Sequence, residues 1–317
     1  MTRLADLVDL PRVPLGTAPT PVRRLDLEYR TDVWVKDESA YGDGKWGGNK
    51  VRKLEWILGE AQRRGSSTIL TVGGIGTHWG LACALYGGDH GVRTVLGLVD
   101  QPVDDHVREQ LRRLERSGAV LHRYSSSVRL RLAAPYLMAR YRPWYVPAGG
   151  SHPVGALAYV DVALEIADQV AARALPEPAV VVVPVGSGGT AAGLALGLRL
   201  AGLRTQVLGI VVNDLLRLDP ESVARLAGRA GAVLRKAGLH DVPTVTAADL
   251  DLPRVWLGGG YGVPTPAGTA EVARATAIGL SVEPVYSGKA LAAIRDLDDA
   301  GELSGPVLWL STHGPRG

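Results

Sequence analysis

The sequence predicts an α/β fold with two lobes and largely parallel, twisted sheets. Short runs rich in β-branched residues alternate with helical patterns, and the joints between them contain glycine. The runs 180–185 and 207–212 are almost continuously apolar, which is typical of strands covered on both faces. A chain of 317 residues is long enough for two compact lobes.

The expected elements follow from these patterns in chain order. Strands are predicted at 33–36, 67–72, 93–99, 119–124, 180–185, 207–212 and 306–310, and helices at 78–86, 104–117, 128–141, 154–174 and 191–200. The segment 54–159 holds three or four strand–helix units of its own. We therefore expect a smaller inserted α/β domain at 54–159 and a large domain built from 1–53 and 160–317.

Composition excludes several classes of protein. The net charge of +3 is small, and Glu109 and Glu115 interrupt the densest basic stretch, 108–116, so no nucleic-acid partner is expected. Cys83 is the single cysteine and lies in an apolar run, which favours inert packing and excludes a disulfide or a cysteine-rich metal site. No long uncharged apolar stretch or leader pattern is present, so we expect a cytoplasmic protein with no membrane contact. We also expect no bound metal.

A glycine-rich turn between a strand and a helix indicates an anion site. Gly186, Ser187, Gly188, Gly189 and Thr190 follow the strand at 180–185 and precede the helix at 191–200. Backbone N–H groups, two hydroxyls and the helix dipole can converge there on a phosphate, and the glycines permit close backbone approach. The competing interpretation is an ordinary strand-to-helix turn.

Lys50 lies in the second glycine-rich run, Gly47-Gly48-Asn49-Lys50-Val51-Arg52-Lys53. The chain has six lysines among 35 basic residues, so a lysine in this setting is notable. A lysine that forms an imine must be held rigidly and must lose its proton, and both burial and neighbouring cations lower its pKa. Taken alone, the run also fits a surface turn with a solvated lysine.

Three further loops carry candidate ligand groups. In the first, Gly76, Thr77, His78 and Trp79 follow a strand and open a helix, where N–H groups and Thr77 can hold a carboxylate and His78 can bond a cofactor oxygen or move a proton. A helix cap with a satisfied histidine explains the same pattern equally well. Tyr261 and Tyr286 stand in glycine-containing loops that favour either ligand contact or packing between lobes.

Together and in this order, these runs resemble the D-cysteine desulfhydrase / 1-aminocyclopropane-1-carboxylate (ACC) deaminase family. That family is a branch of the fold type II, tryptophan synthase β-like enzymes that use pyridoxal 5′-phosphate. The resemblance extends from Thr17-Ala18-Pro19-Thr20-Pro21 to Gly314. Gly47-Gly48-Asn49-Lys50-Val51-Arg52-Lys53-Leu54-Glu55 is its most specific part, and Gly260-Tyr261-Gly262-Val263-Pro264 with Pro284-Val285-Tyr286-Ser287-Gly288-Lys289 supports the branch.

The resemblance implies a role for each candidate residue. Lys50 would form the Schiff base and take the substrate α-proton, with Thr77, Tyr261 and Tyr286 as further catalytic groups. Asn49, His78, Thr312 and residues 186–190 would bind the cofactor, Thr312 at its pyridine nitrogen. Gly76, Thr77, His78, Trp79, Tyr261, Tyr286 and Ser287 would contact the substrate. A homodimer is also implied.

Departures from the family concern the substrate. The usual Gln-Ser-Asn-His run is Gly76-Thr77-His78-Trp79 here, and the usual terminal His-Thr-Gly-Gly is Ser311-Thr312-His313-Gly314. Members that open the cyclopropane ring carry Glu where this chain has Ser287. A carboxylate there keeps the pyridine nitrogen protonated, whereas a hydroxyl leaves it neutral. Ser287 with Thr312 therefore favours elimination of a β-substituent.

The resulting hypothesis is a lyase or deaminase that uses pyridoxal 5′-phosphate on a small amino acid and releases a keto acid and ammonia, with D-cysteine as the leading substrate. The alternatives that keep the cofactor are a β-replacement enzyme, a racemase, a cysteate lyase and an ACC deaminase. A non-catalytic protein that binds a phosphate ligand is the alternative from another class.

Overall fold

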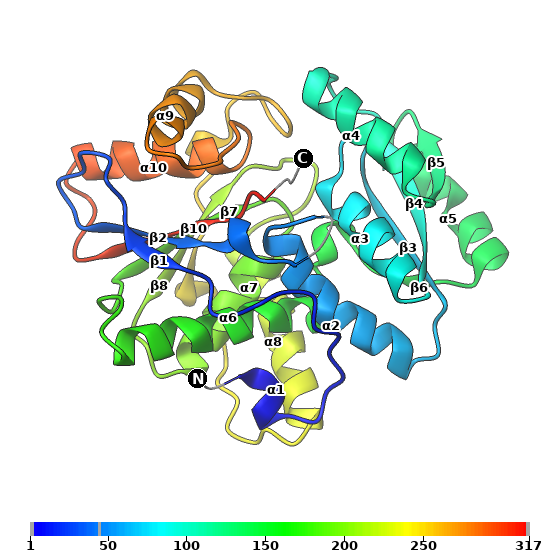
Figure 1. The fold of residues 1–317 in the computed structure, drawn as a ribbon, viewed down its shortest axis with the longest axis horizontal. Coiled ribbons are helices and arrows are strands. Elements are labelled where there is room, and N and C mark those ends of the chain that lie inside the picture. Colours follow the sequence, from blue (N-terminus) through cyan, green and yellow to red (C-terminus); the bar gives the residue numbers. More distant parts are fainter. Residues whose placement is uncertain (1–2, 44–45, 315–317) are drawn as a thin grey trace.

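The computed structural model describes residues 3–43 and 46–314, and it contains two separate β-sheets (Figure 1). The larger sheet has the strand order β1 (Val22–Arg24), β2 (Val33–Asp37), β10 (Val307–Ser311), β7 (Val180–Val185), β8 (Gln206–Val211), β9 (Leu250–Asp251). Its strands pair in parallel except for β1 with β2. The second strand, β2, therefore lies beside the last strand, β10, although more than 260 residues separate them in sequence.

The smaller sheet is parallel throughout. Its order is β5 (Val120–Tyr124), β4 (Arg93–Val99), β3 (Thr68–Gly74), β6 (Trp144–Tyr145). All four strands fall inside the segment 54–159, where the sequence predicts an inserted domain. The domain boundaries themselves stay a prediction.

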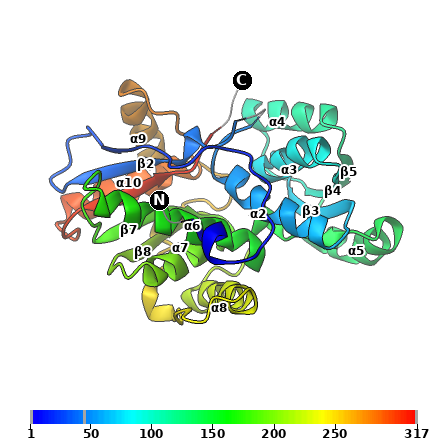
Figure 2. The same cartoon turned by 60° about the horizontal axis from the view of Figure 1, so that its bottom comes forward.

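Ten helices among the described residues surround these sheets. They are α1 (Leu4–Leu7), α2 (Asn49–Arg63), α3 (His78–Asp89), α4 (Asp105–Arg116), α5 (Ser127–Tyr141), α6 (Pro153–Ala171), α7 (Gly189–Leu200), α8 (Pro220–Lys236), α9 (Pro266–Ala277) and α10 (Ser287–Asp299). Figure 2 shows α6, α7 and α8 on one side of the larger sheet and α10 on the other. Within the described ranges, no helix combines the length and apolarity needed to cross a bilayer.

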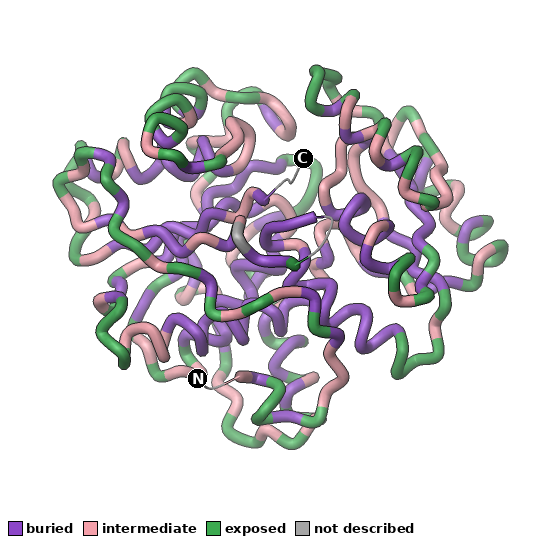
Figure 3. Tube along the Cα trace, in the orientation of Figure 1, coloured by how far each residue is buried: buried purple, intermediate pink, exposed green. Residues whose placement is uncertain are grey.

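Alternate residues of the central strands enter different cores. Val181 and Val183 pack in the cluster formed with α6, α7 and α8, whereas Val182 packs in the cluster formed with α10. Because neighbouring side chains point to opposite faces, a strand covered on both sides must be apolar at every position. Figure 3 shows the buried residues concentrated along these strands and the helices beside them. The predicted α/β fold with parallel-rich sheets is confirmed.

A buried ion network fixes α2 to the larger lobe. The guanidinium of Arg52 bonds Glu38 at 2.6 Å and Glu165 at 3.1 Å, and Lys36 lies 2.5 Å from Glu165. These side chains are at most 3% exposed. Since buried charges are tolerated only when paired, the network holds one orientation of α2, the helix that carries Lys50.

Candidate active site

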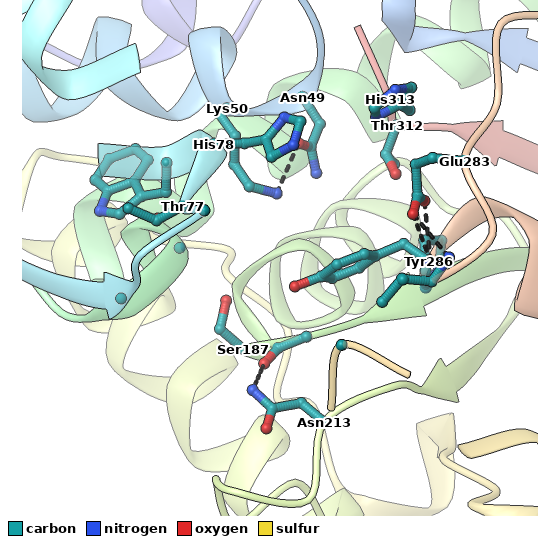
Figure 4. A pocket seen from close by; sticks show the side chains of 18 of the residues that line it. Asn49, Lys50, Thr77, His78, Ser187, Asn213, Glu283, Tyr286, Thr312 and His313 are labelled. Atoms are coloured by element: carbon teal, nitrogen blue, oxygen red, sulfur yellow. Dashed lines mark hydrogen bonds between the residues drawn. The ribbon is translucent and has the colours of Figure 1, made fainter. Parts of the chain in front are cut away.

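One cavity of about 710 Å³ collects most of the candidate residues. It opens at the carboxyl ends of β3, β7 and β10, and the first turns of α2, α3 and α7 face it. Parallel α/β sheets bind ligands at that edge. Figure 4 shows Lys50, His78, Ser187, Tyr286 and Thr312 around this space.

Lys50 is the second residue of α2, and its amine lies at the cavity. The Nζ donates to Asn49 Oδ1 at 2.8 Å. Withdrawal from water lowers the pKa of Lys50 to about 8, and the carboxylate of Glu283 partly offsets that shift. A solvated surface turn, the competing interpretation of this run, is wrong.

The start of α2 is held by the end of the chain. Gly48 adopts φ +88°, and a Cβ there would stand 2.9 Å from the backbone nitrogen of Gly314. Gly47 N donates to Gly314 O, and Asn49 N donates to the carbonyl of Thr312. The glycines before Lys50 therefore permit a close contact between segments that are far apart in sequence.

The turn at 186–190 forms a compact cradle. Gly188 caps α7 with φ +84°, Asn213 Nδ2 donates to Gly186 O at 2.8 Å, and Ser151 Oγ donates to Ser187 Oγ at 2.8 Å. Gly186, Ser187, Gly188 and Thr190 line the same cavity as Lys50. Gly189 lies just behind them, where its N–H donates to Ser151 Oγ.

Lys53 is a cavity residue that the sequence analysis did not single out for ligand binding. Its Nζ donates to Gly149 O at 3.1 Å, and burial holds the pKa of Lys53 well below its usual value, with the Lys50 charge adding to the shift. Gly149 abuts Ser187, because a Cβ on Gly149 would come 2.2 Å from Ser187 Oγ. Lys53 therefore brings an amine toward the cradle. The sequence could have indicated this position, because Lys53 follows Lys50 by three residues and residues three apart on a helix lie on the same face.

Arg52 follows Lys50 by two residues and is not among the groups that shift the pKa of Lys50. Arg52 points into the ion network with Glu38 and Glu165, away from the cavity. Successive residues of a helix face different directions, which is why only Lys53 shares a face with Lys50.

The 76–79 loop caps helix α3 and also lines the cavity. Thr77 caps α3 by accepting from Gly80 N at 3.1 Å, while Gly76, Thr77 and His78 line the cavity. Trp79 also reaches the wall, but it is 2% exposed and its Nε1 donates to Thr71 Oγ1 at 2.8 Å. The indole of Trp79, which was expected to contact the substrate, is therefore held in a fixed position in the cavity wall.

Two tyrosines meet on another side of the cavity. Tyr286 donates to the hydroxyl of Tyr261 at 3.1 Å, and their rings are perpendicular with centroids 6.3 Å apart. Burial raises the pKa of both phenols, so both are neutral near pH 7. They can donate or accept hydrogen bonds there without carrying charge.

Ser287 is not among the cavity-lining residues, in contrast to its expected substrate contact. It is the first residue of α10, wholly buried, and its backbone N–H donates to Glu283. Glu283 takes the wall position instead, where Figure 4 shows it beside Thr312. Burial raises the pKa of Glu283, and the backbone N–H groups of residues 285–287 oppose that shift.

These residues fit pyridoxal 5′-phosphate. A glycine cradle at a helix start suits the phosphate, and a lysine of lowered pKa suits an aldehyde. A match to the model of pyridoxal-phosphate dependent enzymes covers residues 13–312. The chain belongs to this family. It is therefore an enzyme that uses pyridoxal 5′-phosphate.

Relatives narrow the family to one branch. The D-cysteine desulfhydrase of Klebsiella pneumoniae (strain 342) is 31% identical over 98% of this chain and 96% of its own length. That of Salmonella choleraesuis (strain SC-B67) has the same identity and coverage. A solved ACC deaminase homologue superposes with a TM-score of 0.83, 27% identity, and coverage of 99% of this chain and 95% of its own. These findings confirm the branch predicted from sequence and indicate a lyase or deaminase.

Proposed function

We propose that this enzyme eliminates a β-substituent from a small amino acid and releases a keto acid and ammonia. The observation that carries the proposal is that the Lys50 amine and the 186–190 cradle open into one cavity. Full-length similarity to D-cysteine desulfhydrases supports this reaction class and makes D-cysteine the first substrate to test.

The proposed roles follow from the contacts of each residue. Residues 186–190 with Lys53 would hold the phosphate, and Thr312 would face the pyridine ring. When bound, the cofactor withdraws electrons from the substrate α-carbon. Lys50, whose pKa of about 8 leaves some amine neutral near pH 7, would take the α-proton. Asn49 would orient that amine through its 2.8 Å hydrogen bond.

The remaining residues would bind the substrate and move protons. Thr77 and the N–H groups at the start of α3 suit the α-carboxylate, because a helix N-terminus favours an anion. Tyr261 and Tyr286, both neutral and hydrogen-bonded to each other, are placed to donate a proton to a departing group. His78 would contribute to the wall around the substrate.

A second reaction has a specific observation in its favour. Glu283 supplies a carboxylate beside Thr312. Members of the resembled family that open the cyclopropane ring use a carboxylate to keep the pyridine nitrogen protonated. Deamination of ACC is therefore the second candidate.

Release of keto acid from a panel of amino acids tests both candidates. The panel contains D- and L-cysteine, D- and L-β-chloroalanine and ACC. Pyruvate from the β-substituted alanines supports elimination, whereas 2-oxobutanoate from ACC with no pyruvate supports ring opening. No keto acid from any of them, with the cofactor bound, contradicts the proposal.

We also propose a cytoplasmic homodimer. The single cysteine, Cys83, is buried and its pKa is raised by burial, which fits a protein that does not depend on oxidised thiols. The dimer follows from the family resemblance. Light scattering coupled to size-exclusion chromatography tests it, and a monomer at micromolar concentration contradicts it.

A further inference from the structure

Three imidazoles from distant parts of the chain meet at the rim of the cavity. His78 begins α3, His106 lies in the first turn of α4, and His313 follows β10. The Nε2 atoms of His78 and His106 are 2.9 Å apart, with their rings stacked at 5.1 Å. The rings of His78 and His313 are 5.5 Å apart. Figure 4 shows His78 near Lys50 and His313 next to Thr312.

Helix α4 extends this cluster with two more polar side chains. His106, Gln110 and Arg113 are spaced by four and three residues, so they share one helix face, and all three line the cavity. Gln110 is only 2% exposed, and its Nε2 lies 3.2 Å from His78 Nε2. Its Oε1 has no hydrogen-bond partner within the described part of the chain. A buried polar atom without a partner is costly, which indicates that a ligand or water completes this site.

The hydrogen bonds define which groups are left for a ligand. His78 Nε2 can accept from both His106 and Gln110 only if it carries no proton, which leaves the His78 Nδ1–H as a donor. If the Gln110 amide is turned over, its NH₂ becomes the unpaired group instead. The first arrangement offers the His78 Nδ1–H to a ligand, and the second offers the Gln110 NH₂ group instead. The Arg113 guanidinium, which also pairs with Glu109, lines the same cavity.

The acids near these donors already have partners. Two acids of this region line the cavity, but Asp104 accepts from Val107 N as the cap of α4, and Glu109 pairs with Arg112 and Arg113. Lys50 of α2 is a cation that lowers the pKa values of His78 and His313. Among the described residues, no group of three acidic, histidine or cysteine side chains is arranged to hold a metal ion.

The imidazoles can gain protons when an anion arrives. Withdrawal from water, repulsion by His313, His106 and Lys50, and the Arg113 charge hold the pKa of His78 well below its usual value. Burial and repulsion by His106 and Lys50 lower the pKa of His313 to about 4. Both are therefore neutral at pH 7, and a bound anion would raise both pKa values.

We propose that His78, His106, His313, Gln110 and Arg113 form an oxyanion subsite for the substrate's β-substituent. The substrate class is then an amino acid whose β-carbon carries a sulfonate, phosphate or carboxylate rather than a bare thiol. This inference rests on the proposed function, because that function puts an amino acid between Lys50 and the cluster. A thiol offers one weak donor and would leave most of these groups unpaired, whereas an oxyanion accepts several hydrogen bonds at once.

A pair of substrate analogues tests binding without any reaction. Neither 3-sulfopropanoate nor propanoate has an amino group, and they differ only in the sulfonate. Calorimetry on the holoenzyme at pH 7, in buffers of different ionisation enthalpy, measures affinity and proton uptake together. We expect 3-sulfopropanoate to bind at least about tenfold more tightly, with proton uptake, and to tighten as the pH falls from 8 to 6. Equal affinities or no proton uptake would overturn the proposal.

Parallel arms with 3-phosphonopropanoate and succinate identify the preferred oxyanion. NMR of the imidazole resonances provides the assignment, since the proposal requires the resonances of His78 and His313 to shift toward the protonated form on binding. Unshifted resonances with a saturating ligand would contradict it.

Variants of α4 test the subsite through specificity. For His106→Asn and Gln110→Leu, we expect the ratio of kcat/KM on cysteate or O-phosphoserine to that on β-chloroalanine to fall about tenfold or more, mainly through KM. His240→Asn, at an exposed position outside the cavity, is the matched control. Because the ratio is taken on one preparation, partial misfolding cancels, and an unchanged ratio in both variants would refute the subsite.

The two proposals fail in different ways. Rapid release of keto acid from neutral substrates, with no preference for acidic ones and no proton-linked binding of 3-sulfopropanoate, refutes the subsite and leaves the lyase proposal standing. Proton-linked binding of 3-sulfopropanoate by an enzyme that releases no keto acid refutes the lyase proposal and retains the anion site.

Discussion

Tyr286 donates its phenolic hydrogen to the oxygen of Tyr261 at 3.1 Å, from a loop 25 residues further along the chain. Both hydroxyls belong to the cavity that contains Lys50. One neutral phenol of such a pair can donate a proton to a leaving group, and the hydrogen bond from the other phenol stabilises the phenolate that remains.

Removing either phenol hydroxyl should lower kcat by roughly a hundredfold, the scale of one general acid. If the pair acts as a unit, the Tyr261→Phe/Tyr286→Phe double variant should be little worse than the poorer single variant. Steady-state kinetics on D-cysteine, whose departing thiolate accepts a proton, measures this, with Tyr145→Phe, exposed and outside the cavity, as the control. Losses that multiply in the double variant would show independent roles.

Cofactor uptake should depend on the protonation of Lys50. With a pKa of about 8, roughly a tenth of the amine is neutral at pH 7 and roughly nine tenths at pH 9. The rate at which the cofactor-free protein gains its visible absorbance should therefore rise through this range, with a midpoint near pH 8. A midpoint at the ordinary lysine value would show that the amine is solvated before the cofactor binds.

Lys53 should contribute to cofactor affinity through its charge. A bound phosphate would raise the lowered pKa of Lys53 and so favour its charged form. Lys53→Gln removes that charge, and hydrogen bonds to charged groups contribute about 1.5–3 kcal/mol, so the Kd for pyridoxal phosphate should rise about 10- to 100-fold. Equilibrium dialysis measures this. Lys236→Gln, on the exposed side of α8, is the control and should leave the Kd unchanged. Equal Kd values for the two variants would remove Lys53 from the phosphate site.

The ion network under α2 should stabilise the fold. Arg52→Ala removes the guanidinium that pairs with the buried carboxylate of Glu38 and leaves Glu165 with Lys36 alone, which costs about 3–5 kcal/mol. Arg24→Ala breaks an exposed pair with Asp32 and should cost at most about 1 kcal/mol. Chemical denaturation of the cofactor-free protein compares the two free energies of unfolding, so ligand binding does not contribute. Similar losses in both variants would contradict a role for the network in fixing α2.

Local patterns were enough to predict much of the fold. The strand at 180–185 agrees with β7, which is apolar at every position because both faces are covered, and the expected strand at 93–99 agrees with β4. The helices α1, α2, α8, α9 and α10 were not predicted. The buried residues Val223, Ala227, Ala230 and Leu234 of α8 nevertheless have the spacing of one helix face. The short strands β6 and β9 exist only through pairing with distant segments.

The site was predictable only where one short segment carried the signal. Lys50 and the cradle each stand in a single glycine-rich run, and both reach the cavity. Glu283, His106 and Gln110 have no local signature, because the folded chain alone brings α4 and the loop before α10 to this wall. Ser287 is not among the cavity-lining residues, because its place in the first turn of α10 turns it into the interior.

Reduction with borohydride, followed by peptide mass mapping, tests the central claim most directly. The holoenzyme is reduced, digested and searched for a lysine that carries the reduced cofactor. We predict the label on Lys50 alone, and its loss, together with the visible absorbance, in Lys50→Ala. A label on Lys53 or another lysine, or an unchanged label and colour in Lys50→Ala, would contradict the account.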